Sequence, residues 1–268
     1  MRKEDVSNLP IDESGIKKYM RKYANDLSVF TFERIDSTNN LAREYAEKGH
    51  GQFTVIIAEE QTKGRGRLGR SFYSPANSGI YMSLILRPTL PPEKALYMTT
   101  AAAAAVAEAI EDVCQKRTEI KWVNDVLCEG KKVCGILTEG VFDQNGSFRY
   151  AILGVGVNVY QSKEGFPEEI KDVASHLADT PLYELRSRLA AEILERFISY
   201  YKKIEDKLFM KSYRERLCFL GERVNVISGD TLTPATVIGL GDNFELEVVF
   251  DDGKRTLLSS GEVSIRRS

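Results

Sequence analysis

Apolar positions recur along the chain with two different periods, and these periods predict where strands and helices lie. Phe30, Phe32 and Ile35 alternate with polar residues, which is typical of a half-buried strand. Between residues 182 and 207 the apolar positions instead recur at helical spacing and predict one long amphipathic helix. The same criteria predict further elements: strands over 54–58, 79–86, 119–122, 126–128, 133–139 and 150–159, and helices over 13–23, 39–48 and 91–115.

The order of these elements indicates the fold class. Strands and helices do not alternate strictly, and Glu129-Gly130-Lys131 is typical of a hairpin turn, so we expect an α+β fold with a mixed or antiparallel sheet and packed helices. From residue 221 onward, short β-rich segments alternate with turns, which predicts a small closed β-domain of about five strands. The predicted division is an N-terminal extension over 1–28, a main domain over 29–219 and a C-terminal β-barrel over 220–268.

Composition narrows the classes of function. The 268 residues carry a formal net charge of -2, which argues against a protein that mainly coats nucleic acid. No apolar run is long enough to span a membrane, and the first ten residues contain no apolar signal region, so we expect a cytoplasmic protein. The four cysteines form no CxxC pair and are expected to be free thiols. His50 and His176 are the only histidines, so a zinc site or a histidine-based triad is not expected.

The densest chemical signal lies in a polar loop predicted over residues 61–78. Its segment Lys63–Arg70 combines three glycines, which let the backbone approach a ligand, with cations that suit phosphate or carboxylate oxygens. The segment contains a GxGxxG pattern, but Ser71–Pro75 follows it instead of a helix, which argues against a dinucleotide site. No Walker loop is present either. From these residues alone, a solvated basic loop and an RNA-binding segment stay open.

A second candidate site surrounds the only tryptophan. Lys121 ends a short predicted strand directly before Trp122, where it could direct a cation into a cleft, although a strand lysine more often faces solvent. Lys132 precedes Gly135 in the next strand, and a glycine inside a strand is compatible with close approach of a ligand or of another backbone segment.

Taken together and in order, six segments resemble those of biotin protein ligases. The resemblance covers about residues 30–266 and rests on Asp36-Ser37-Thr38-Asn39, Glu60-Gln61 with Gly64–Arg70, Lys121-Trp122-Val123-Asn124-Asp125, Lys132-Val133-Cys134-Gly135-Ile136-Leu137, Gly154-Val155-Gly156-Val157-Asn158-Val159 and Gly261-Glu262-Val263-Ser264-Ile265-Arg266. It implies the class II synthetase-like fold of biotin and lipoate ligases. The family usually has proline where Val123 stands, and we expect valine to keep a strand-like path there.

The resemblance also implies roles for individual residues. It implies that biotin is bound by Ser37, Thr38, Asn39, Gln61, Arg65, Gly66, Arg67 and Lys121. It implies that the nucleotide is bound by Arg67, Arg70, Phe72, Asn124, Lys132 and Asn158. The residues that it implies for catalysis are Lys121, Arg65 and Arg67.

The activity that the resemblance implies has two half-reactions. Biotin and ATP, the latter with Mg²⁺, form biotinyl-5′-AMP, and biotin then passes to a lysine of the biotin carboxyl carrier domain of a carboxylase. No fixed metal site and no membrane contact are expected, whereas a homodimer stays open. About 29 residues precede the first predicted strand, too few for the DNA-binding domain of some relatives, so DNA binding is not expected. The alternatives are a lipoate or octanoate ligase with the same fold, a dinucleotide-dependent enzyme, and a non-catalytic nucleic-acid-binding module.

Overall fold

Two β-sheets organise the chain, and the larger one carries the candidate site. The computed structural model describes residues 10–228, 231–259 and 263–267. Its large sheet has the strand order β1-β2-β3-β7-β6-β5-β4. The pair β1·β2 is parallel and every other neighbouring pair is antiparallel, so the predicted mixed sheet is confirmed. The strands are β1 (Ser28–Ile35), β2 (Thr54–Gln61), β3 (Gly79–Leu86), β4 (Glu119–Lys121), β5 (Asp125–Cys128), β6 (Lys131–Phe142) and β7 (Phe148–Asn158).

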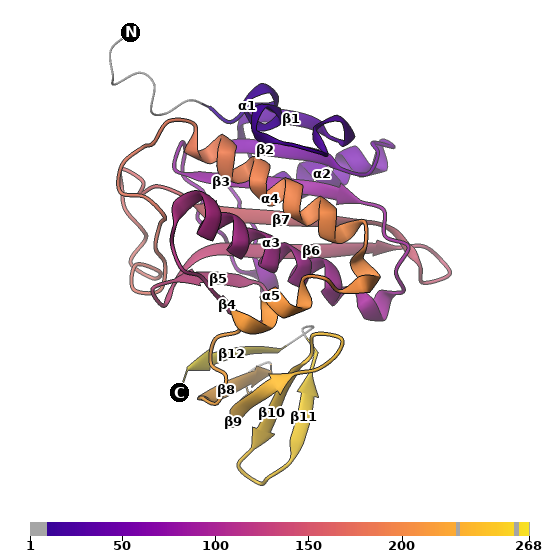
Figure 1. Ribbon diagram of the computed structural model, residues 1–268, viewed down its shortest axis with the longest axis vertical. Helices are drawn as coiled ribbons and strands as arrows, with labels where there is room; N and C mark the ends of the chain where they lie inside the picture. The colour runs from indigo at the N-terminus through magenta and orange to yellow at the C-terminus, as the bar shows by residue number, and fades with distance from the viewer. Residues whose placement is uncertain (1–9, 229–230, 260–262, 268) are drawn as a thin grey trace.

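Helices cover the two faces of this sheet unequally. In Figure 1, α1, α3, α4 and α5 lie in front of the sheet and α2 lies behind it. Among the helices, α2 packs on β2, β3 and β7, whereas α3 packs on β4, β5, β6 and α4. The helices are α1 (Glu13–Tyr19), α2 (Thr38–Glu47), α3 (Leu96–Cys114), α4 (Leu185–Tyr201) and α5 (Met210–Glu215). The face that carries α2 is therefore the one on which helices leave room for a ligand.

Glycines occupy the part of that face next to α2. In β6 and β7, Gly135 pairs with Gly156 and Leu137 pairs with Gly154. Directly paired residues in neighbouring strands point to the same side of a sheet, and every second residue of a strand returns to that side. Gly135, Gly154 and Gly156 therefore form a low floor that carries no side chains of its own.

Most predicted elements are confirmed, with shifts at their ends. The predicted hairpin is present, with positive φ at Glu129 (52°) and Gly130 (74°). The helix predicted over 91–115 begins with a short 3-10 turn (Pro92–Lys94) before α3. The helix predicted over 182–207 is α4, which ends at Tyr201 and is followed by a 3-10 turn at Ile204–Asp206.

The path predicted for Val123 is wrong. Residues 122–124 form a turn between β4 and β5, the Trp122–Val123 peptide bond is cis, and Val123 is buried. Tyr213 of α5 donates a hydrogen bond from its hydroxyl to the Val123 carbonyl oxygen at 3.2 Å. A residue of α5 thus holds the turn in place. No local pattern in residues 119–128 indicates this interaction.

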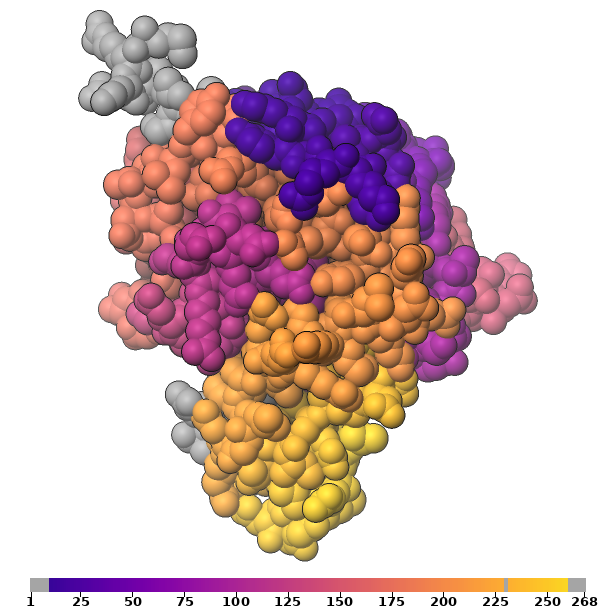
Figure 2. All heavy atoms as spheres, in the orientation of Figure 1, coloured from indigo at the N-terminus to yellow at the C-terminus, as the bar shows by residue number. Residues whose placement is uncertain are grey.

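The C-terminal strands form their own antiparallel sheet, which appears as a lower lobe in Figure 2. Its order is β11-β10-β9-β8-β12, which confirms the prediction of about five strands. In the described residues β11 and β12 lie at opposite edges and do not pair with each other, so the sheet is open and the predicted closed barrel is not seen. The resemblance to residues 261–266 falls partly outside the described residues, because Gly261 and Glu262 are not among them. The strands are β8 (Arg223–Ser228), β9 (Thr231–Leu240), β10 (Leu246–Phe250), β11 (Arg255–Leu258) and β12 (Val263–Arg267).

One turn of this small sheet inserts into the main domain. Phe244, between β9 and β10, is fully buried and stacks on Phe209 with ring centroids 5.1 Å apart. Its carbonyl oxygen accepts a hydrogen bond from Nε1 of Trp122 at 2.9 Å, and Asn243 accepts one from the Tyr97 hydroxyl at 2.6 Å. The C-terminal sheet is therefore in direct contact with the segment that follows Lys121.

Candidate functional site

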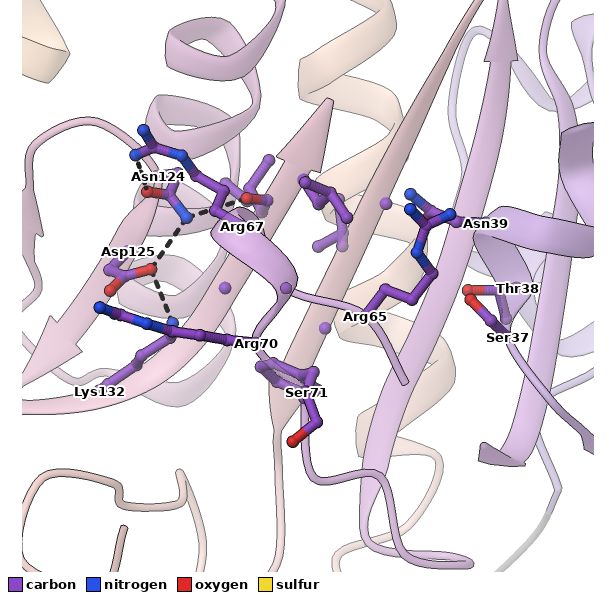
Figure 3. Close-up of a pocket in the computed structure, with 18 of the residues that line it drawn as sticks. Ser37, Thr38, Asn39, Arg65, Arg67, Arg70, Ser71, Asn124, Asp125 and Lys132 are labelled. Atoms are coloured by element: carbon purple, nitrogen blue, oxygen red, sulfur yellow. Dashed lines mark hydrogen bonds and ion pairs between the residues drawn. The ribbon is translucent and has the colours of Figure 1, made fainter. Parts of the chain in front are cut away.

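A pocket opens on the α2 face of the large sheet, beneath the loop that joins β2 to β3 (Figure 3). The predicted site residues that line it are Ser37, Thr38, Asn39, Gln61, Arg65, Gly66, Arg67, Arg70, Phe72, Lys121, Asn124 and Lys132. Asn158 is not among the lining residues, and its Nδ2 donates to the backbone oxygen of Ser175 at 3.1 Å. Segments up to 119 positions apart in the chain, from Ser37 to Gly156, thus meet around one cavity.

The glycine floor decides the depth of this pocket. A Cβ atom added at Gly156 would lie 2.5 Å from Cε1 of Phe72, and one at Gly135 would lie 3.1 Å from both Phe72 and Lys132. A Cβ atom at Gly154 would overlap Oδ1 of Asn39 and would lie 3.0 Å from its Cγ. Side chains at these positions would therefore displace the aromatic ring and the amide that line the cavity.

One end of the pocket is neutral and rich in hydrogen-bonding groups. Ser37, the N-cap residue of α2, is in extended backbone conformation and is buried together with Thr38 and Asn39. Oε1 of Gln61 accepts from the Thr38 backbone N–H at 2.8 Å and lies 3.0 Å from the Thr38 hydroxyl. Nε2 of Gln61 donates to Ser74 at 2.9 Å, so its amide orientation is fixed. This end suits a polar, uncharged ligand group that both donates and accepts hydrogen bonds.

Two of the three loop arginines, Arg65 and Arg67, reach opposite ends of the pocket. Arg65 extends toward Asn39 in Figure 3 and forms an ion pair with Glu139 at 2.9 Å. Arg67 extends the other way and donates to Oδ1 of Asn124 at 3.0 Å. Burial lowers the pKa of the Arg67 guanidinium, and the charge of Asp125 partly offsets that effect. An arginine nevertheless stays protonated in proteins, so Arg67 supplies a partly desolvated cation.

The second end of the pocket is basic. Arg67, Arg70, Lys121 and Lys132 line it, and Lys132 forms an ion pair with Asp125 at 2.7 Å. Such a group of cations suits an anion with several charges, for example the phosphates of a nucleotide. Among the described residues, no cluster of His, Cys, Asp and Glu has the composition of a metal site.

Two functional candidates were missed from the sequence. Ser83 of β3 is fully buried, with its hydroxyl 2.6 Å from Oδ1 of Asn39 and 2.8 Å from the hydroxyl of Thr38. Glu139 of β6 accepts from Nδ2 of Asn39 at 2.8 Å. The available signals were a serine within the apolar run Gly79–Leu86 and a carboxylate on the pocket-facing side of β6, and neither identifies its partner.

Comparison with known proteins agrees with this arrangement. The biotin/lipoate A/B protein ligase family matches residues 31–158. Over 221 residues the chain is 32% identical to the biotin--[acetyl-CoA-carboxylase] ligase of Mycobacterium tuberculosis, covering 78% of this chain and 77% of that protein. The chain belongs to the biotin/lipoate A/B protein ligase family. It is also 44% identical over 144 residues to the bifunctional ligase/repressor BirA of Bacillus spizizenii, covering 54% of this chain but only 44% of that relative.

Solved structures of the family share the fold. The biotin protein ligase of Aquifex aeolicus, in complex with biotin and ATP, superimposes with a TM-score of 0.74 at 29% sequence identity. The match covers 90% of this chain and 99% of that one. The α+β fold predicted for a biotin and lipoate ligase is therefore confirmed. No helix of the described residues has the length and apolar character needed to cross a membrane.

Proposed function

We propose that this ligase activates biotin with ATP to biotinyl-5′-AMP and transfers the biotinyl group to a lysine of a carrier protein. The observation that carries the proposal is the polarity of the single pocket lined by the predicted residues. Its neutral end presents hydroxyl and amide groups, its basic end presents lysines and arginines, and a glycine floor joins them. Biotin has the same order of groups, a neutral cyclic urea at one end and a carboxylate at the other.

The basic end would promote the first half-reaction by offsetting charge. A carboxylate oxygen attacks the α-phosphorus of ATP, the bond to the β-phosphate oxygen breaks, and pyrophosphate leaves. Two anions must approach each other in this step, so Lys121 and Arg67 are proposed as the catalytic cations. Arg65, the third cation predicted for catalysis, reaches the neutral end instead, where it pairs with Glu139. Fixed cations of this kind are typically worth about 10²–10³-fold each in rate.

The second half-reaction needs a carrier lysine instead of a nucleophile from the ligase. The neutral amine attacks the acyl carbon of the adenylate, AMP leaves, and an amide bond forms. We propose the biotin carboxyl carrier domain of a carboxylase as the acceptor, since the M. tuberculosis relative is named for acetyl-CoA carboxylase. Among the described residues, no strand pairs with the outer side of the edge strand β1, and a homodimer formed there would show a doubled mass in solution.

Magnesium is proposed to enter with the nucleotide. Mg²⁺ commonly binds substrate phosphates together with one or two carboxylates. Asp125 is the carboxylate among the lining residues, and it is already paired with Lys132. The described residues therefore fit a metal that arrives as Mg–ATP, a substrate, and not one held in a preformed protein cage.

The remaining proposals concern the chain as a whole. We place the protein in the cytoplasm, because its four cysteines are free thiols, as expected in a reducing compartment. We also propose the domain division at about residues 28 and 219. The N-terminal part is then an extension whose Ile11, Ile16 and Met20 pack in the main core.

A transfer assay tests the proposed function. The purified chain is incubated with Mg–ATP, labelled biotin and an isolated carrier domain, and the label on the carrier is measured after denaturation. We expect label only with ATP present, together with one AMP per biotin, and none on a carrier whose acceptor lysine is replaced by arginine. Label on the carrier from lipoate or octanoate but not from biotin would replace this proposal with a lipoate-type ligase.

A further inference from the structure

A carboxylate outside the pocket lining connects two of the residues that line it. Glu139 lies on β6 and points to the α2 face, with only 17% of its side chain exposed. Its Oε2 accepts from Nδ2 of Asn39 at 2.8 Å, and its Oε1 pairs with Arg65 at 2.9 Å. Arg43 approaches the same oxygen at 3.4 Å. One carboxylate thus bridges α2 and the loop over the pocket.

The contact with Glu139 fixes how Asn39 presents its amide. A carboxylate only accepts hydrogen bonds, so the NH₂ group of Asn39 must face Glu139 and its oxygen must face the other way. That oxygen lies 2.6 Å from the hydroxyl of Ser83, directly above Gly154. An amide oxygen has two lone pairs. Asn39 can therefore accept a ligand N–H at the neutral end of the pocket while it keeps Ser83.

The contact with Arg65 fixes the position of the loop. Besides its ion pair with Glu139, the guanidinium donates to Oδ1 of Asn40 at 3.0 Å. Both partners lie at the neutral end of the pocket, so Arg65 spans that end and its charge is offset there. The other two loop arginines, Arg67 and Arg70, line the basic end, where Arg67 contacts Asn124.

We propose that Glu139 is a positioning residue for the recognition of a cyclic urea. It orients the Asn39 oxygen toward the N–H donors of the ring and, through Arg65, holds the loop closed over the ring. This inference rests on the proposed function, because it assigns the neutral end to biotin. Glu139 itself touches neither the reacting carboxylate nor the phosphates, so it should affect binding of the ring and not the chemical step.

Glu139→Gln is the sharpest test because it keeps the size of the side chain. The glutamine amide cannot form the ion pair with Arg65, and its NH₂ group can turn toward Asn39. The Asn39 amide would then flip, so that its oxygen faces position 139 and its NH₂ group faces the ligand. With the Asn39 oxygen turned away from the ring and the loop no longer held through Arg65, we expect the KM for biotin to rise by about 10- to 100-fold, as for the loss of a hydrogen bond to a charged group. The assay is biotin-dependent exchange of labelled pyrophosphate into ATP. In this assay, kcat and the KM for ATP should stay within about twofold of the wild-type values. A change in the biotin KM alone indicates that binding of biotin is weakened and that the chemical step is not.

Two further variants separate positioning from general structural support. Arg43→Gln removes the longer contact of the same carboxylate, and its biotin KM should match that of the wild type. Arg65→Gln and the double variant Arg65→Gln/Glu139→Gln form a double-mutant cycle, in which positioning through Arg65 predicts that the two effects are less than additive. The melting temperature is measured for every variant.

The outcomes distinguish this inference from the proposed function. An unchanged biotin KM in Glu139→Gln, with an active wild type, would overturn the inference and leave the function intact. A rise in the biotin and ATP KM values by the same factor, accompanied by a fall in melting temperature, would overturn it in favour of a structural role. A wild type without biotin-dependent exchange would refute the function and the inference together.

Discussion

Replacing Gly154 with alanine would place a methyl group where the Asn39 amide now lies. The added Cβ atom would overlap Oδ1 of Asn39 and lie 3.0 Å from its Cγ. The strand cannot retreat easily, because β7 pairs with β3 on one side and with β6 on the other. Asn39 must therefore move, which breaks its bonds to Glu139 at 2.8 Å and to Ser83 at 2.6 Å.

The size of the effect follows from those two bonds. A hydrogen bond to a charged group contributes about 1.5–3 kcal/mol and a neutral one about 0.5–1.5 kcal/mol, so their joint loss costs about 2–4.5 kcal/mol. Each 1.4 kcal/mol or so is a factor of ten in affinity, and the KM for biotin should therefore rise by at least about 30-fold. The KM for ATP should change by less than about threefold, since Asn39 lies at the neutral end of the pocket.

A matched variant in the same strand shows whether the loss is local. Gly156→Ala adds the same methyl group on the same face, but its Cβ atom meets the ring of Phe72, a loop side chain that can turn away. We expect Gly156→Ala to alter the KM for ATP more than that for biotin. Pyrophosphate exchange at varied biotin and at varied ATP measures both values. A folded Gly154→Ala protein with a wild-type biotin KM would refute the reasoning.

Three further predictions address other parts of the molecule. Lys121→Ala should lower the rate of adenylate formation by about 10²–10³-fold with an unchanged melting temperature, and wild-type turnover would contradict its role. Phe244→Ala should lower the free energy of unfolding by about 3–5 kcal/mol, whereas the exposed Leu257→Ala should leave it nearly unchanged, as chemical denaturation can measure. Burial raises the pKa of the Cys128 thiol to about 11 and that of Cys134 further, so both should react with a thiol reagent at pH 8 only after unfolding, and rapid reaction of the native protein would contradict this.

Local patterns predict the elements of the fold better than the contacts between them. The β-branched run of β2 and the turn residues Glu129 and Gly130 determine their own conformations, and both were predicted. The insertion of Phe244 beneath Trp122 joins positions 122 apart in the chain, and nothing in either local sequence indicates it. The turn at Val123 also depends on a contact that is distant in sequence, because a tyrosine 90 positions away donates a hydrogen bond to its carbonyl oxygen.

The candidate site shows the same contrast between features that local sequence predicts and contacts that it does not. Loop composition and the order of motifs predict most of the residues that line the pocket, because cations and glycines act there through their own chemistry. Asn158 was also predicted, yet its amide is turned to a backbone oxygen outside the lining. Ser83 and Glu139 were missed, because their roles depend on an asparagine that is 44 positions from one and 100 from the other. Such pairings follow from sheet register, which the sequence of a single strand does not contain.

The central claim is that this chain forms an adenylate of biotin, and pyrophosphate exchange tests it most directly. The purified protein is incubated with ATP, magnesium and labelled pyrophosphate, and biotin, lipoate or octanoate is added in turn. The account predicts label in ATP with biotin and none with the other two acids. Exchange with lipoate or octanoate alone, or no exchange with any acid from folded protein, would contradict it.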